Sequence, residues 1–186
     1  MRFPIGLRLN VKSLVVSNIQ IEQEILRPLL TNTVQRIHVL VESAGDFECA
    51  MLKDAEILKV HDGGTGFIRP PMIINLTNLK ANIDVVNWTV EDFMKVVRNW
   101  VEVVKKKVGT SYKFTLILEE NITQHLIESI NEQYGEAKEI GDLSMTIPTK
   151  YGSSINVSIT ILDYSYNEYT YEIKFTVVPK ELDLPV

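Results

Sequence analysis

Residues 155–177, INVSITILDYSYNEYTYEIKFTV, contain two runs in which apolar and polar side chains alternate. A period of two residues is typical of a β-strand with one face in the core and the other in solvent. Only a short polar segment separates the two runs, which favours an antiparallel hairpin. The stretch therefore predicts a sheet that is apolar on one face.

The phase of the alternation restricts the register of this hairpin, because a shift of one residue would place apolar residues opposite polar ones. A two-residue turn at Asn167-Glu168 has this fault, whereas a three-residue loop at 166–168 matches the two apolar faces. We therefore predict that Asp163 pairs with Tyr171, Ile161 with Ile173, Ile159 with Phe175 and Val157 with Val177.

The composition also favours a sheet, because isoleucine and valine number 20 each and alanine only 5. The strongest helical pattern covers residues 89–108, where the apolar side chains form one broad stripe, with Thr89 as N-cap and Gly109 as the stop. A second helix is predicted at 122–134, and a less regular one at 19–33. Pro28 lies inside the latter, so either two short helices meet there or one helix begins with Pro28 near its first turn. The predicted fold is α+β, a largely antiparallel sheet with these helices packed on one face.

The N-terminal half contains several further short apolar segments. We expect strands at 34–42 and 55–60, a turn at 62–66 and an antiparallel meander. Strands are also predicted at 5–12 and 47–53, with extended chain at 68–76, and the least regular segment is 77–88. The chain of 186 residues is therefore predicted to be one compact domain, 1–186, with a weak two-lobe seam at 77–88.

Composition and charge exclude several classes of protein. The chain is 45% apolar and 23% charged, as expected for a globular domain and not for a disordered one. The net charge of −5 argues against nucleic-acid binding, and the one basic run is Lys105–Lys107. With only Cys49, no intrachain disulfide can form. The excess of Glu and Lys over Asp and Arg is expected of a thermophile, and an AT-rich genome is an equal explanation for the composition.

We expect a cytoplasmic location, because we find no signal peptide and no apolar stretch long enough to span a membrane. The alternative is a cell-surface or virion protein. It rests on four N-glycosylation sequons, which begin at Asn75, Asn87, Asn121 and Asn156.

The sequence contains no Gly-x-Ser-x-Gly motif and no cofactor fingerprint, so no cofactor is expected and enzymatic activity is not favoured. His38 faces away from the apolar residues of its strand, and His61 ends a strand beside Asp62. If the fold brings the two histidines together, Asp62 or Glu42 could complete a metal or acid–base site. His125 is expected in solvent on the second helix.

Three functions are therefore compared. The first is a non-catalytic binding or assembly module for a protein partner or a second copy, with the contact at Tyr164, Tyr166, Tyr169 and Tyr171. The alternative for these tyrosines is cross-strand packing at the hairpin tip. The second is a carrier of a small apolar ligand between sheet and helix, lined by Phe93, Val97, Trp100 and Phe175. The third is an enzyme or metal site at His38 and His61.

Overall fold

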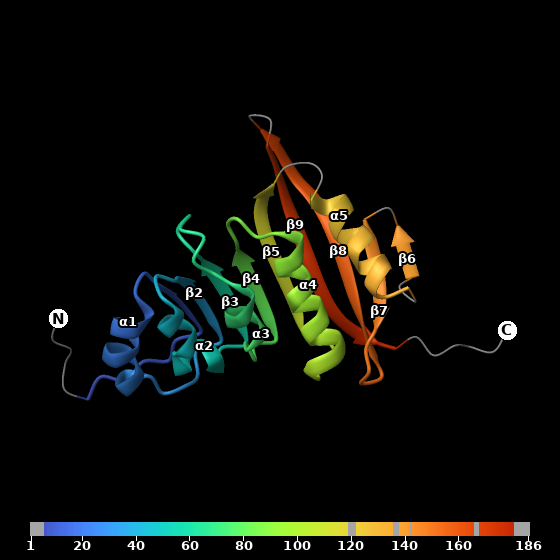
Figure 1. The fold of residues 1–186 in the computed structure, drawn as a ribbon. Coiled ribbons are helices and arrows are strands. Elements are labelled where there is room, and N and C mark those ends of the chain that lie inside the picture. Colours follow the sequence, from blue (N-terminus) through green and yellow to red (C-terminus); the bar gives the residue numbers. More distant parts are fainter. Residues whose placement is uncertain (1–5, 119–121, 136–137, 142, 166–167, 181–186) are drawn as a thin grey trace.

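The computed structural model describes residues 6–118, 122–135, 138–141, 143–165 and 168–180. Within these ranges nine strands form one sheet in the order β1-β2-β3-β4-β5-β9-β8-β7-β6, and the helices lie against it (Figure 1). No helix in the described ranges is long and apolar enough to cross a membrane. The predicted α+β class is confirmed. The strands are β1 (Ser13–Val16), β2 (Arg36–Leu40), β3 (Ile57–His61), β4 (Lys80–Asp84), β5 (Ser111–Leu118), β6 (Lys138–Gly141), β7 (Ser144–Pro148), β8 (Ser153–Ser165) and β9 (Glu168–Pro179).

Strands β1 to β5 are parallel, and each pairs with the next one in the chain. The other neighbours, from β5/β9 to β7/β6, are antiparallel. The described sheet thus has four parallel and four antiparallel pairings, so the expectation of a largely antiparallel sheet is wrong for one half of it. We call β1–β5 with their connections the parallel array, and β6–β9 with helix α5 (Ile122–Gln133) the antiparallel half.

The other helical segments of the described residues are α1 (Ile19–Leu26), a 3₁₀ turn (Arg27–Leu29), a 3₁₀ helix (Ala44–Glu48), α2 (Ala50–Asp54), α3 (Pro70–Ile74), α4 (Val90–Arg98) and a π-helical turn (Asn99–Val103).

The parallel array repeats one strand–helix unit. Its in-register positions are Ser13, Arg36, Ile57, Lys80 and Ser111, which follow one another at steps of 21 to 31 residues. Each step moves to the neighbouring strand in the same direction, so right-handed crossovers place every helix of the array on the same face. This is the connectivity of a solenoid of stacked repeats.

One face of the array therefore stays open, and burial alternates along each strand. In β2, Ile37 and Val39 are buried, whereas Arg36 and His38 are not. Parallel strands are usually covered on both faces and are then apolar throughout. Here only one face is covered, so the parallel strands alternate as antiparallel ones do. This is why the alternation suggested an antiparallel meander.

Two segments of the array that we expected to be extended are helical. Residues 47–53 belong to the 3₁₀ helix and to α2, and a capping box between Ser43 and Asp46 stabilises the start of this segment. The segment 68–76 contains α3, in which Pro70 and Pro71 occupy the first turn. Proline is tolerated there because the first N–H groups of a helix have no intrahelical acceptor.

One other boundary in the array differs from the expectation. The first strand begins at Ser13, after the predicted 5–12, and Leu9 forms only an isolated bridge with Leu30. The segment 77–88 contains β4, which pairs with β3 and β5, and a seam between two lobes there stays a prediction. Residues 19–33 contain two short helical segments, as one of the two expected arrangements requires, because α1 ends before Pro28 and a 3₁₀ turn follows.

The predicted helix 89–108 begins as expected but ends early. Thr89 and Asp92 form a capping box, and α4 ends at Arg98 with a π-helical turn to Val103. Trp100 is buried, whereas Val103 and Val108 of the predicted stripe are 61% and 55% exposed. A helix of 20 residues would be about 30 Å long, far longer than the five-residue strand β4 that precedes it. The extended chain after Val103 instead leads to β5.

The C-terminal hairpin has the predicted faces but another register. Ile161 pairs with Tyr171, Ile159 with Ile173, Val157 with Phe175 and Ile155 with Val177, two residues from the predicted pairs. A shift of two residues preserves the alternation, so the phase argument could not detect it. An irregularity between Ile161 and Asp163 changes the register towards the tip, where Ser165 pairs with Glu168.

Aromatic side chains join the two halves under α4. Phe114 of β5 lies within 5.3–5.7 Å, between ring centroids, of Trp88, Phe93 and the β9 residue Phe175. The predicted second helix is confirmed as α5, which buries Leu126 and Ile130 and leaves His125 exposed.

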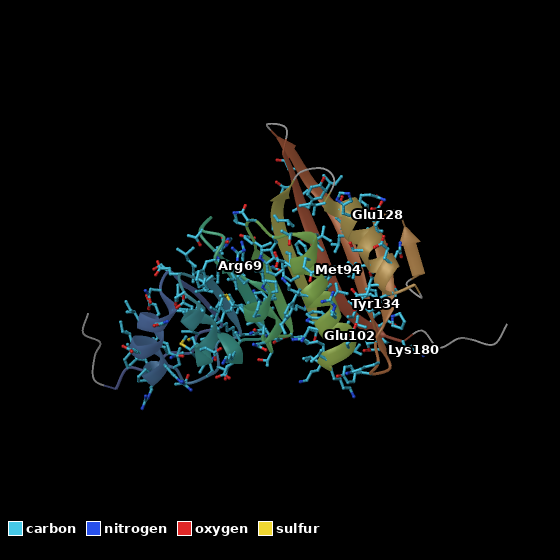
Figure 2. All side chains as sticks on the ribbon, in the orientation of Figure 1. Arg69, Met94, Glu102, Glu128, Tyr134 and Lys180 are labelled. Atoms are coloured by element: carbon cyan, nitrogen blue, oxygen red, sulfur yellow. The ribbon has the colours of Figure 1, made fainter. Side chains whose placement is uncertain are left out.

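Helix α5 is held to the end of the π-helical turn by a polar contact. The hydroxyl group of Tyr134 donates to Glu102 Oε1 at 2.9 Å, and Figure 2 labels both residues. Burial, together with this hydrogen bond, raises the pKa of Tyr134. The contact therefore links the antiparallel half to the last connection of the parallel array.

Candidate functional site

The open face of the parallel array brings the two predicted histidines together. His38 lies on β2 and His61 on β3, on the same face, and their ring centroids are 4.6 Å apart. No spacing in the sequence requires the two histidines to be neighbours. It arises because β2 and β3 pair in parallel with Leu40 opposite His61, which makes the histidines diagonal neighbours.

Asp62 does not join this cluster. Its carboxylate accepts hydrogen bonds from the backbone N–H groups of Gly64, at 2.8 Å, and Gly66, at 3.1 Å. These bonds stabilise the predicted turn, in which both glycines have positive φ angles. Asp62 is 2% exposed. Glu42 also lies elsewhere, where it accepts a hydrogen bond from Asn18 Nδ2 at 3.4 Å.

The acid beside the histidines is Asp84 of β4, which the sequence did not indicate. Its carboxylate pairs with Nδ1 of His61. Burial lowers the pKa of His38, and His61 and Lys59 lower it further, whereas Asp84 raises it. Within the described residues no group of three or more His, Cys, Asp or Glu side chains could hold a metal ion.

Basic side chains surround the histidine pair in register across the sheet. His38 pairs with Lys59, Lys59 with Asn82, and Asn82 with Lys113. A second row contains Arg36 and Lys80. Among the described side chains of β1–β5, this face thus holds four Lys or Arg and one acid, Asp84, in a chain whose net charge is −5.

The basic row continues for one strand beyond the array. Lys113 lies opposite Lys174 of β9, and its ammonium group pairs with Glu172 at 3.0 Å. Like charges in direct register repel each other, and Glu172 offsets this repulsion. Beyond β9, the same face carries Asn156, Ser158 and Thr160 of β8, which are uncharged.

The three lysines of the basic run Lys105–Lys107 have different surroundings, because Lys105 and Lys107 are exposed and Lys106 is partly buried. Lys106 Nζ donates to the backbone oxygen of Leu76 at 2.7 Å and lies over the rings of Trp100 and Tyr112. Burial lowers the pKa of Lys106 to about 8. This lysine therefore joins the end of α3 to the core.

The tyrosines that we expected at a partner contact are only partly described. Tyr171 is 2% exposed and lies in the core, so it cannot form a contact surface. The backbones of Tyr164 and Tyr169 pair opposite each other near the hairpin tip. Tyr166 lies outside the described residues. A contact at the tip stays a prediction for these three residues.

The side chains expected to line a ligand cavity occupy the space between the sheet and α4 themselves. Phe93, Val97, Trp100 and Phe175 are each at most 1% exposed. The ring of Phe175 lies 6.5 Å from that of Phe93 and 6.1 Å from that of Trp100, between centroids. Cys49 is also buried, as predicted, and its thiol group donates to Gln23 Oε1 at 2.8 Å.

The sequence reasoning missed Lys59, Asp84 and Lys113. One signal could have found them, because these residues recur at the polar positions of successive strand–helix units about 20 to 30 residues apart. The recurrence is visible only when the strand–helix units are aligned with one another.

A comparison with known protein families identifies the family of the chain. The profile of a family described as a domain of unknown function (DUF3557) matches residues 1–117, and the chain belongs to this family. The match contains β1–β4 and all of β5 except its last residue. No curated protein and no solved structure matches the chain.

Proposed function

We propose that this chain is a non-catalytic binding module whose open array face docks an acidic segment of a protein partner. The observation that carries the proposal is the separation of charge. The chain has a net charge of −5, yet the described strand residues on this face contain four bases, two histidines and one acid. Charge complementarity of this kind accelerates association and selects partners of opposite sign.

The face also offers apolar contacts beside the charged side chains. Val15 is 74% exposed, and Leu40 and Ile57 are partly exposed on the same face. A protein segment with both acidic and apolar side chains can use both kinds of contact. Sheets that bind single-stranded nucleic acid stack bases on aromatic rings, and the described part of this face contains no Phe, Tyr or Trp. The rings that it does contain are those of His38 and His61, which lie against each other, and His61 is paired with the acid Asp84. We therefore favour a protein partner over a nucleic acid.

The test uses a fluorescent oligoglutamate peptide of about ten residues and measures its anisotropy at low and high salt. We expect saturable binding that weakens as salt rises, because screening acts on exposed charges. The double variant K59E/K113E should weaken binding at least about tenfold, which corresponds to about 1.4 kcal/mol. The matched control K105E/K107E reverses the charge of two exposed lysines outside the strands and should stay within about twofold.

Two results would contradict the proposal. One is an equal loss of binding in the two double variants, which would show that net charge and not the array face governs binding. The other is tighter binding of a single-stranded oligodeoxythymidine of matched charge, which would identify nucleic acid as the partner.

A further inference from the structure

We infer that His38, Lys59 and His61 form a subsite for a phosphoryl group carried by the partner segment. This inference rests on the proposed function and adds the chemistry of one contact. The three side chains lie at neighbouring positions of the open face. Lys59 is the register partner of His38, and His61 follows Lys59 by two residues on the same strand. Adjacent strands are about 4.8 Å apart, so one small anion can contact donors from both.

Asp84 determines which nitrogen of His61 a ligand can use. Nδ1 of His61 pairs with the Asp84 carboxylate, which leaves Nε2 as the ring nitrogen available to a ligand. The negative charge of Asp84 is engaged in this pair. Lys59 is exposed, and it supplies a positive charge beside the two rings.

An anion bound beside His38 would change the protonation of this histidine. The charged groups that act on it are His61 and Lys59 of β3 and Asp84 of β4, and its register partner on β1 is the apolar Val15. Burial, His61 and Lys59 keep the pKa of His38 low in the free protein. A bound dianion would oppose this effect, so His38 would take up a proton and become a charged donor.

A phosphoryl group fits these donors better than a carboxylate does. It carries a charge of about −1.5 to −2 at pH 7 and three acceptor oxygens, whereas a carboxylate has a single charge and two oxygens. The ammonium group of Lys59 and one ring N–H from each histidine match three oxygens. His61, whose Nδ1 faces Asp84, donates to the ligand from Nε2 as an imidazolium cation, in which both ring nitrogens carry a proton. Hydrogen bonds between charged partners are about twice as strong as neutral ones.

The experiment compares three fluorescent peptides of about twelve residues, rich in glutamate, whose central residue is serine, glutamate or phosphoserine. We expect the phosphoserine peptide to bind about tenfold tighter than the glutamate peptide at pH 6.5, with a smaller advantage at pH 8. The variant H38Q should remove most of this advantage while binding of the glutamate peptide stays within about twofold. The exposed His125 provides the matched control H125Q, which should change neither peptide.

The outcomes separate this inference from the proposed function. If the glutamate peptide binds with the expected salt dependence but phosphoserine gives no advantage at either pH, the subsite is refuted and the proposed function stands. An advantage that survives in H38Q, with the variant still folded by circular dichroism, also refutes the subsite. If neither acidic peptide binds, the proposed function fails as well.

Discussion

The parallel array and the antiparallel half share one sheet, but they present different chemistry on its open face. In the array this face holds Arg36, Lys59, Lys80 and Lys113 around the histidine pair. In the described part of the antiparallel half, the rows beyond β9 hold mostly serine, threonine and asparagine. The charge on the open face is therefore concentrated in the array and on the adjoining strand β9, and the array is also where the family match lies.

The two halves also differ in what holds neighbouring strands together. The antiparallel half has long ladders, with β8 and β9 paired over most of their lengths. The array has strands of four or five residues before β5, and side chains bridge its units. Asn78 is an example, because its Nδ2 donates to the backbone oxygens of Leu52 and Ala55 at 2.7 and 2.6 Å.

We expect the largest loss of stability from a substitution where the parallel array meets the antiparallel half. Phe114 is fully buried between rings of the array and Phe175 of β9. The substitution Phe114→Ala should lower the free energy of unfolding by about 3–5 kcal/mol, because it leaves a cavity. Urea unfolding followed by tryptophan fluorescence and by circular dichroism should still show one coincident transition. Ile161→Ala, at a half-exposed position of β8, is the control and should cost far less.

Two separated transitions in the Phe114→Ala protein would contradict this expectation. They would show that the halves unfold independently and that the chain has a seam. The coincident transition that we expect corresponds to the single compact domain predicted from the sequence.

We expect a smaller loss of stability from a substitution within the parallel array. Asn78→Ala removes the two hydrogen bonds to the carbonyl groups of Leu52 and Ala55 and leaves these buried groups without that partner. We expect a loss of about 2 kcal/mol in the free energy of unfolding. The control is Asn82→Ala on the open face, which should change stability by at most about 0.5 kcal/mol. Equal effects of the two substitutions would show that Asn78 does not join the units.

The antiparallel half was the more predictable one. Alternation identified the faces of β8 and β9, and helix 122–134 was located almost to the residue, because local patterns suffice for such elements. The register failed by two residues because the irregularity between Ile161 and Asp163 leaves no periodic signal. Registers that differ by two residues have the same alternation of apolar and polar side chains. Contacts with the neighbouring elements, and not the alternation, therefore decide between them.

The array was harder to predict because its strands are parallel yet open on one face. The alternation of Ile37 and Val39 is the same in a meander and in a one-sided parallel sheet. Only the recurrence of the strand–helix units distinguishes the one-sided parallel sheet from the meander. This recurrence is a similarity between positions about 20 to 30 residues apart. The histidine pair could be suspected from the sequence, but Asp84 and Lys59 became neighbours only through the strand order.

The central claim is that an acidic partner binds the open face of the array and not the antiparallel half. Backbone amide chemical shifts of the whole chain, followed by nuclear magnetic resonance during titration with the oligoglutamate peptide, test it most directly. We predict that the largest changes fall on β2–β5, around Arg36, Lys59, Lys80 and Lys113. Changes confined to α4 and α5, or to the β8–β9 hairpin, would contradict the account.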